Sequence, residues 1–177
     1  VAADGVNQPL STLFTVIATQ NPIDFDSTNP LPEAQLDRFL TSIKLGYPDA
    51  DAELHLLGEY REAAKRDPLA VLDKGSVTAL REACDKVHLH ADLARYIVTL
   101  ARATRIEPNI KLGSSPRGAM HLASACKGYA LVKGRQQVIA EDIQKLIPPV
   151  WNHRLLPRHG RDNDSTQAHE LMQNIVA

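Results

Sequence analysis

The chain has 177 residues, and its 20 Lys and Arg side chains nearly balance its 21 Asp and Glu, for a formal net charge of -1. This balance argues against sequence-independent binding along nucleic acid, which requires a strongly basic surface, so we expect no nucleic-acid partner. No apolar run approaches the roughly 18 residues that span a bilayer, and the start of the chain lacks the order of a secretory signal. We therefore expect a soluble, cytoplasmic protein without a membrane span.

The first strand signals lie near the start of the chain. Asp4-Gly5, between apolar residues, predicts a hairpin turn. The unbroken apolar and β-branched run at residues 13–19 is typical of a strand that is covered on both faces. Pro22 cannot donate to a strand ladder, so the predicted strand ends before it. This pattern favours a strand inside an α/β domain.

A short helix and a second strand are predicted next. Pro32 is suited to a helix start, and an acid follows it in the first turn, which predicts a helix over residues 32–39. Residues 41–47 alternate weakly and predict a strand that ends at Pro48. Two such strands cannot form a sheet with two buried faces on their own. We therefore expect residues 1–48 to be the end of an α/β domain whose beginning lies outside this chain.

After residue 48 the periodicity becomes helical. Apolar stripes and capping signals predict six helices, which involve residues 52–60, 76–84, 93–104, 115–134, 141–148 and 166–176. Ser76 is predicted to cap the second helix, and Ser115, which precedes a proline, to cap the fourth. The adjacent Pro148 and Pro149 are expected to break the fifth helix. The sequence thus predicts a compact helical bundle.

The histidines do not predict a metal site. His88 and His90 lie close in sequence, as do His153 and His159, but no third and fourth ligand of suitable spacing stands near either pair. We therefore expect no metal ligands in this chain.

Several blocks of sequence resemble the nucleotide-binding core and lid of MoxR-type AAA+ ATPases. The core blocks are ATQNPI at 18–23, PLPEAQLDRF at 30–39 and GYP at 46–48. The lid blocks are ATR at 103–105, GSSPR at 113–117, GR at 134–135 and PPVWNHR at 148–154. All of them occur in the family order, and together they cover residues 1 to about 158.

This resemblance implies an α+β fragment of a P-loop AAA+ module. Residues 1–48 would be the C-terminal remnant of a parallel α/β core, with a presensor hairpin, the sensor 1 strand, the arginine-finger helix and the last strand. Residues 49–177 would form the all-α lid domain.

The resemblance also implies three site residues. Asn21 matches sensor 1, whose amide orients the attacking water and contacts the γ-phosphate of ATP. Arg38 matches the arginine finger, which one subunit supplies to the ATP of its neighbour. Arg117 matches sensor 2, which links the lid to the nucleotide, either in its own subunit or across the interface.

From the residues alone, each of these three has a simpler alternative. Asn21 is suited to a turn before Pro22, and Arg38 to an ion pair on a helix surface. Arg117 could cover the start of its helix, although a cation is disfavoured at that end. The functional roles therefore depend on the family resemblance.

Two parts of an ATP site are missing from the sequence. It contains no GxxxxGK[ST] phosphate-binding loop and no apolar strand that ends in adjacent acids for Mg²⁺. In the family both lie upstream of the blocks found here. We therefore expect the intact protein to be an ATPase that binds ATP and Mg²⁺, and this chain alone to be inactive.

The family implies a function for the intact protein. We expect a homo-oligomer, a hexameric ring, that uses ATP for chaperone-like remodelling or maturation of a von Willebrand factor A domain protein or another client. A magnesium-chelatase-like AAA+ subunit is one alternative. The other is a non-enzymatic helical interaction module that has kept the lid without the motor.

Overall fold

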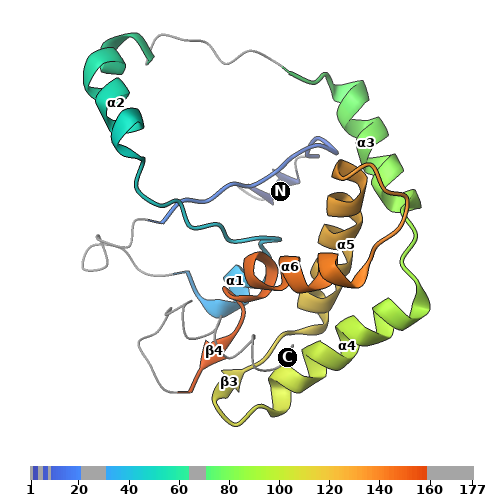
Figure 1. The fold of residues 1–177 in the computed structure, drawn as a ribbon. Helices are drawn as coiled ribbons and strands as arrows, with labels where there is room; N and C mark the ends of the chain where they lie inside the picture. Colours follow the sequence, from blue (N-terminus) through green and yellow to red (C-terminus); the bar gives the residue numbers. More distant parts are fainter. Residues whose placement is uncertain (1, 4–5, 8, 21–30, 64–70, 159–177) are drawn as a thin grey trace.

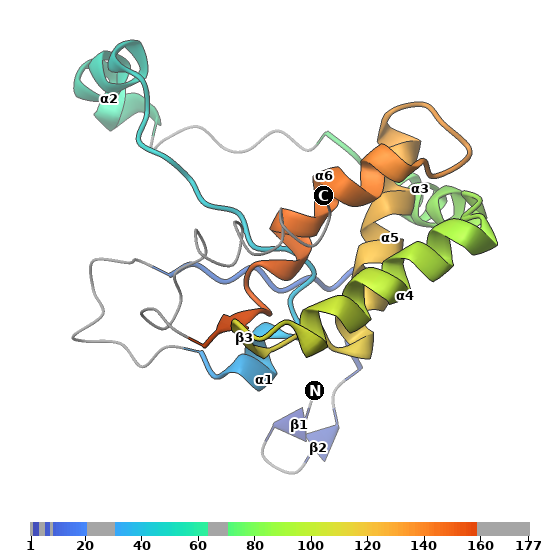
Figure 2. The same ribbon diagram turned by 60° about the horizontal axis from the view of Figure 1, so that its bottom comes forward.

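The computed structural model describes residues 2–3, 6–7, 9–20, 31–63 and 71–158 (Figure 1). In chain order, its elements are β1 Ala2–Ala3, β2 Val6–Asn7, α1 Glu33–Leu36, α2 Ala50–Ala63, α3 Lys74–Lys86, α4 Ala91–Ile106, β3 Ile110–Leu112, α5 Pro116–Val132, α6 Ala140–Trp151 and β4 Leu156–Pro157. Helices α3 to α6 gather into one cluster, and α2 stands apart from it at the end of an extended segment (Figures 1 and 2). The described part of the chain is therefore mostly helical.

The hairpin predicted near the start of the chain is present. Strands β1 and β2 pair antiparallel, with Ala2 opposite Asn7 and Ala3 opposite Val6. The pair lies at the edge of the molecule, away from the helical cluster (Figure 2). It is two residues long on each side, so it contributes little to the core.

The two strands predicted at residues 13–19 and 41–47 are wrong for this structure. Both segments are extended, but neither pairs with another strand of the described chain. Their apolar side chains are open to solvent, with Ile17 87% and Leu45 94% exposed. A strand forms only where a neighbouring strand satisfies its backbone groups, whereas the N–H of Ser42 donates to Pro149 of helix α6 at 2.8 Å and neither segment is paired in a described sheet. The expected remnant of a parallel α/β core is therefore not formed here.

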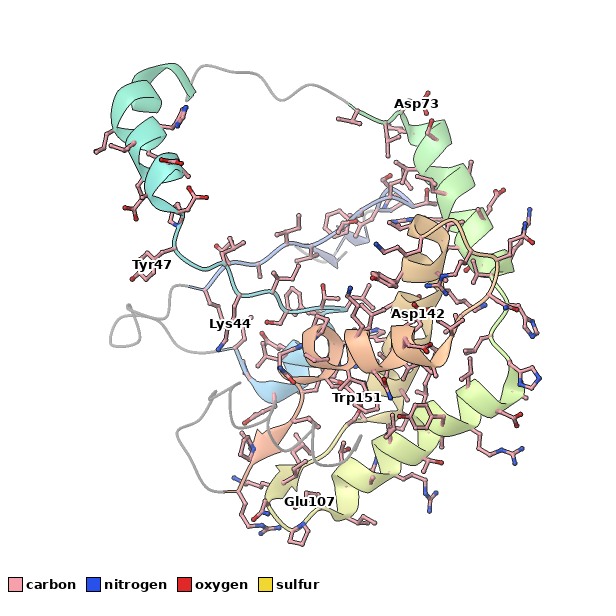
Figure 3. The ribbon with its side chains drawn as sticks, in the orientation of Figure 1. Lys44, Tyr47, Asp73, Glu107, Asp142 and Trp151 are labelled. Carbon is pink, nitrogen blue, oxygen red and sulfur yellow. The ribbon has the colours of Figure 1, made fainter. Side chains whose placement is uncertain are left out.

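Figure 3 shows the contrast between the segment at residues 41–47 and the helical cluster. Lys44 and Tyr47 lie on the stretch that leads away to α2, whereas Trp151 lies in the middle of the cluster. Tyr47 is 91% exposed and Trp151 is fully buried. Among the described residues, the packing thus comes almost entirely from those after α2.

The helix starts follow the capping rules, with one correction. Ser115 caps α5 as predicted, because its hydroxyl accepts a hydrogen bond from the backbone N–H of Gly118 at 3.0 Å. Helix α3 is capped by Asp73, and not by Ser76. The Asp73 carboxylate accepts from the backbone N–H of Ser76 at 2.6 Å, so the helix begins earlier than predicted.

Helix α6 runs through the two prolines that were expected to break it. Pro148 and Pro149 each lack an N–H, yet the helix continues to Trp151. Its apolar face explains this, since Ile147, Val150 and Trp151 are each at most 1% exposed and pack into the core. Burial of this face outweighs the lost hydrogen bonds.

The core lies between α4, α5 and α6, and α3 covers one side of it. Its buried apolar residues are Val87, Ile97, Leu100, Ala101, Leu122, Cys126, Ala130, Val138, Ile143, Ile147, Val150, Trp151 and Leu155. Helices α5 and α6 make the most extensive contact, so they form the centre of the helical cluster.

A short sheet that the sequence did not predict ties the end of this region together. Strand β3, between α4 and α5, pairs antiparallel with β4, which follows α6. Ile110 lies opposite Pro157, and Leu112 opposite Leu156. This pairing brings the residues after α6 close to the start of α5, where the candidate site lies.

Two further sequence expectations concern the last predicted helix and the absence of a membrane span. The predicted helix at residues 166–176 lies outside the described residues. Among the helices of the described part, none combines the length and apolar character needed to cross a bilayer.

Candidate functional site

The carboxylate of Asp37 is the centre of a polar cluster that joins the segment after α1 to the start of α5. The Ser115 hydroxyl donates to its two oxygens at 2.9 and 3.0 Å. Arg117 Nη1 lies 3.4 Å from Oδ2, and Arg154 Nε lies 3.2 Å from Oδ1. We call these four residues the Asp37 cluster, and it links parts of the chain 78 to 117 residues apart.

Arg154 is the buried member of the Asp37 cluster, with a side chain that is 1% exposed. Besides the carboxylate, it donates Nη2 to the backbone oxygen of Asp37 at 3.2 Å and Nη1 to that of Leu40 at 3.3 Å. It also donates to the backbone oxygens of Phe39 and Val150. The guanidinium therefore clamps residues 37–40 onto the end of α6.

Two histidines surround the same guanidinium. Arg154 Nη1 lies 2.7 Å from Nε2 of His153, and Nη2 contacts Nδ1 of His121. Burial, reinforced by the Arg154 charge, lowers the pKa of His153 to about 4. The same two causes lower the pKa of His121 below its ordinary value. Both rings are therefore neutral near pH 7, which avoids placing a second positive charge beside Arg154.

The loop before α5 is fixed by buried backbone contacts. The Ser114 N–H donates to Thr104 Oγ1 at 2.9 Å, and Arg105 Nε donates to the Ser114 backbone oxygen at 2.8 Å. Gly113 passes so close to α4 that a Cβ there would stand 2.7 Å from backbone atoms of Thr104 and Arg105. These contacts hold Ser115 in place both as a helix cap and as a donor to Asp37.

Helix α5 also packs closely against the Arg154 side chain. A Cβ at Gly118 would stand 2.5 Å from Ser114 Oγ and 3.2 Å from Arg154 Cδ. The backbone oxygen of Gly118 accepts a hydrogen bond from Trp151 Nε1 at 2.9 Å. The absence of a side chain at this position therefore lets α5, α6 and Arg154 meet.

The three residues predicted from the sequence lie in different situations. Arg38 is exposed and follows Asp37 directly, so it projects from the segment that Arg154 clamps. Arg117 lies in the first turn of α5 and is 53% exposed, within reach of Asp37. Asn21 lies outside the described residues. The structure thus brings the segment of Arg38 and the side chain of Arg117 together through one carboxylate.

These residues have the chemistry of an anion-binding site. Arg117 holds Asp37 only at 3.4 Å and keeps half of its side chain in solvent, so its remaining N–H groups can donate to a phosphate. Arg38 is also open to an anion. Within the described residues, no group of three or more His, Cys, Asp or Glu side chains is arranged to hold a metal ion. The two exposed guanidinium groups can therefore contact an anion such as a phosphate.

Sequence reasoning missed two members of the Asp37 cluster, Asp37 and Arg154, and the neighbouring His121. Asp37 stands beside Arg38 inside one block of the family resemblance, and Arg154 ends another. Their positions inside these blocks are the sequence signal from which the two residues could have been chosen as site candidates. Their contact could not be predicted, since the two residues are 117 positions apart.

Two family models match the chain. The model described as ATPase family associated with various cellular activities (AAA) matches residues 1–41. The model described as AAA lid domain matches residues 102–175. The first range contains Arg38 and Asp37, and the second contains Arg117 and Arg154, so the Asp37 cluster spans both.

Curated relatives show the same similarity over most of the chain. The uncharacterized protein YeaC of Bacillus subtilis is 36% identical over 178 residues, which is 100% of this chain and 56% of the relative. Chaperone MoxR1 of Mycobacterium tuberculosis is 35% identical over 168 residues, 88% of this chain and 44% of the relative. Protein MoxR of Paracoccus denitrificans is 29% identical over 160 residues. The chain therefore spans about half the length of the curated relatives it matches.

A solved structure is similar to the whole chain. The crystal structure of a candidate ATPase from Cytophaga hutchinsonii superposes with a TM-score of 0.81 at 30% sequence identity. The match covers 99% of this chain and 56% of the other. The fold described above is thus shared with about half of a longer protein.

Proposed function

The chain belongs to the MoxR family of AAA ATPases, as the C-terminal portion with the lid domain, and from this premise we propose that it acts within a ring-forming ATPase. In this proposal residues 1–48 belong to the ATPase core and residues 49–177 to the lid. The complete protein binds ATP with Mg²⁺ and uses hydrolysis to remodel or mature partner proteins. The name of the Mycobacterium tuberculosis relative, Chaperone MoxR1, supports the remodelling role.

The observation that carries this proposal is the Asp37 cluster. Asp37 directly precedes Arg38, and it is bonded by Ser115 and Arg117 at the start of α5. Residues proposed as arginine finger and sensor 2 are therefore connected through a single side chain. Such a connection is what an enzyme needs if the state of one ATP site is to affect the next.

Each proposed residue has a chemical task. Arg38 reaches the ATP of a neighbouring subunit, where its planar guanidinium matches the charge spread over the transferred phosphoryl oxygens. Arg117 donates to the phosphates from the first turn of α5, where the helix end also favours an anion. Asn21 orients the attacking water through its neutral amide. Further partners, such as a von Willebrand factor A domain protein, belong to the same proposal.

Steady-state ATPase measurements on the full-length protein test this function. The wild type is expected to hydrolyse ATP only with Mg²⁺. Replacing the finger, Arg38→Ala, should lower kcat by about a thousandfold and leave the Kd for ATP within about twofold, because the finger stabilises the transition state. Arg95→Ala, an exposed arginine on α4, is the matched control and should have no effect. Unchanged turnover in Arg38→Ala would remove Arg38 from the finger role.

A further inference from the structure

The bonding pattern of Arg154 is unusual for a residue of a helical core. Its side chain is 1% exposed, and taking a guanidinium out of water is unfavourable unless its N–H groups are satisfied. Most of its bonds go to one short stretch, namely the carboxylate and backbone oxygen of Asp37 and the backbone oxygens of Phe39 and Leu40. This stretch contains Arg38.

Apolar packing would be sufficient to hold such a segment against α6. A guanidinium does more, because its N–H groups point in fixed directions and bind carbonyl oxygens only in a narrow range of orientations. Bonds to the backbone oxygens of Asp37, Phe39 and Leu40, on both sides of Arg38, therefore fix both the position and the orientation of the backbone at Arg38. Ser42, just beyond the clamp, adds one more tie, since its N–H donates to the Pro149 oxygen at 2.8 Å.

Arg154 is held in turn by the centre of the lid. Its Cδ lies close to the site of Gly118 in α5, and it follows α6, whose last residue Trp151 is fully buried. The segment of Arg38 is thus fastened both to the end of α6 and to α5, whose first turn carries Arg117. A shift of these helices would carry Arg38 with it.

Resting on the proposed function, we propose that Arg154 is a positioning residue for Arg38. It contacts no substrate. It fastens residues 37–40 to the lid helices, so that the finger offered to the neighbouring ATP site moves with the lid of its own subunit. Asp37 forms ion pairs with both Arg117 and Arg154, so its carboxylate connects the two arginines.

Kinetics of the full-length ATPase test this proposal. Arg154→Met keeps the length of the side chain without its donors, and we expect kcat to fall by about tenfold or more with the Kd for ATP within about twofold, because the finger is misplaced while nucleotide binding is spared. Arg154→Lys, which keeps the charge without the fork, should retain more of kcat. The matched control is Arg158→Met, an arginine four residues further on that donates to the Pro108 oxygen and should not change kcat.

A double mutant separates positioning from a general structural role. If Arg154 acts through Arg38, adding Arg154→Met to Arg38→Ala should not slow the residual turnover further, because the effects of residues acting as a unit are not additive. Additive losses, or a kcat of Arg154→Met within about twofold of wild type, would overturn the proposal. If Arg38→Ala itself leaves turnover unchanged, the proposed finger role fails instead, so the two failures are distinguishable.

Hydrogen exchange on this chain gives a second readout that does not depend on activity. In Arg154→Met the amide of Ser42 should exchange about tenfold faster, because its bond to Pro149 is no longer held in place, whereas the amides of Leu100 and Ala101 in α4 should be unchanged. If Arg154→Met unfolds, so that all amides exchange fast, Arg154→Lys serves for the same comparison. Unchanged exchange at Ser42 in a folded variant would contradict the clamp.

Discussion

Two glycines of helix α5 should respond in opposite ways to the same substitution. Gly→Ala inside a helix normally stabilises by about 0.5–1 kcal/mol. At Gly128 the new Cβ would meet Cys84 Sγ at 3.8 Å, an ordinary contact, so the full gain is expected. At Gly118 the new Cβ would stand 2.5 Å from the hydroxyl of Ser114, which is fully buried, and 3.2 Å from Arg154. Overpacking of this kind costs about 1–3 kcal/mol, which after the helix gain leaves a net loss of up to about 2.5 kcal/mol.

Urea unfolding followed by fluorescence measures both effects. The protein has one tryptophan, and Trp151 donates to the backbone oxygen of Gly118, so its emission reports directly on the packing in question. The free energy of unfolding should fall in Gly118→Ala and rise in Gly128→Ala. A stabilised Gly118→Ala variant would refute the close approach of α5 to Arg154, and with it the geometry of the Asp37 cluster.

Three further measurements examine the buried groups. Asp37→Ala leaves the Arg154 charge without its carboxylate and should lower the free energy of unfolding by about 2–4 kcal/mol. The control is Asp92→Ala, which removes a 78% exposed carboxylate and should change the free energy of unfolding by less than about 0.5 kcal/mol. Equal effects of the two substitutions would contradict the pairing of Asp37 with Arg154. The pKa of His153 is lowered from its ordinary 6.5 to about 4 in the folded protein. As the pH falls below about 6.5, the unfolded chain takes up the proton first, so the free energy of unfolding should decrease by about 2 kcal/mol between pH 6.5 and pH 4. This magnitude allows for the partial exposure of the ring. The free energy of unfolding of His153→Gln should fall by that much less in an acid titration, and a pH dependence equal to that of the wild type would rule out a neutral, half-buried His153. Burial raises the pKa of Cys126 to about 12, so a thiol reagent should modify only the partly exposed Cys84 in the native chain and both cysteines in urea; equal native rates would exclude the packing of Cys126 in the core.

Local signals in the sequence predicted the helical part of the fold well. Ser115 followed by a proline marks the start of α5, because a hydroxyl cap and a fixed backbone angle act within a few residues. The same local reasoning failed at Pro148 and Pro149, where burial of the apolar face of α6 outweighs two missing N–H groups. It also placed a cap at Ser76, although Asp73 lies three residues earlier and offers a better acceptor.

The strands and the site depended on partners distant in sequence. Residues 13–19 have the apolar pattern of a buried strand, but pairing needs a neighbour that the described chain does not provide. Arg38 and Arg117 were predicted from the family resemblance, whereas the contact of Asp37 with Arg154 arises from tertiary packing across 117 positions. No periodicity or spacing encodes such a contact, so only the structure could reveal it.

A subunit-mixing experiment tests the central claim, that Arg38 serves the ATP site of a neighbouring subunit, most directly. Full-length Arg38→Ala subunits are mixed with subunits that cannot bind nucleotide but keep Arg38, each inactive alone. In a ring with a finger supplied by the neighbour, an equal mixture should recover about a quarter of the wild-type ATPase activity, because that share of interfaces pairs an intact site with an intact finger. A mixture as inactive as its two components would contradict the account.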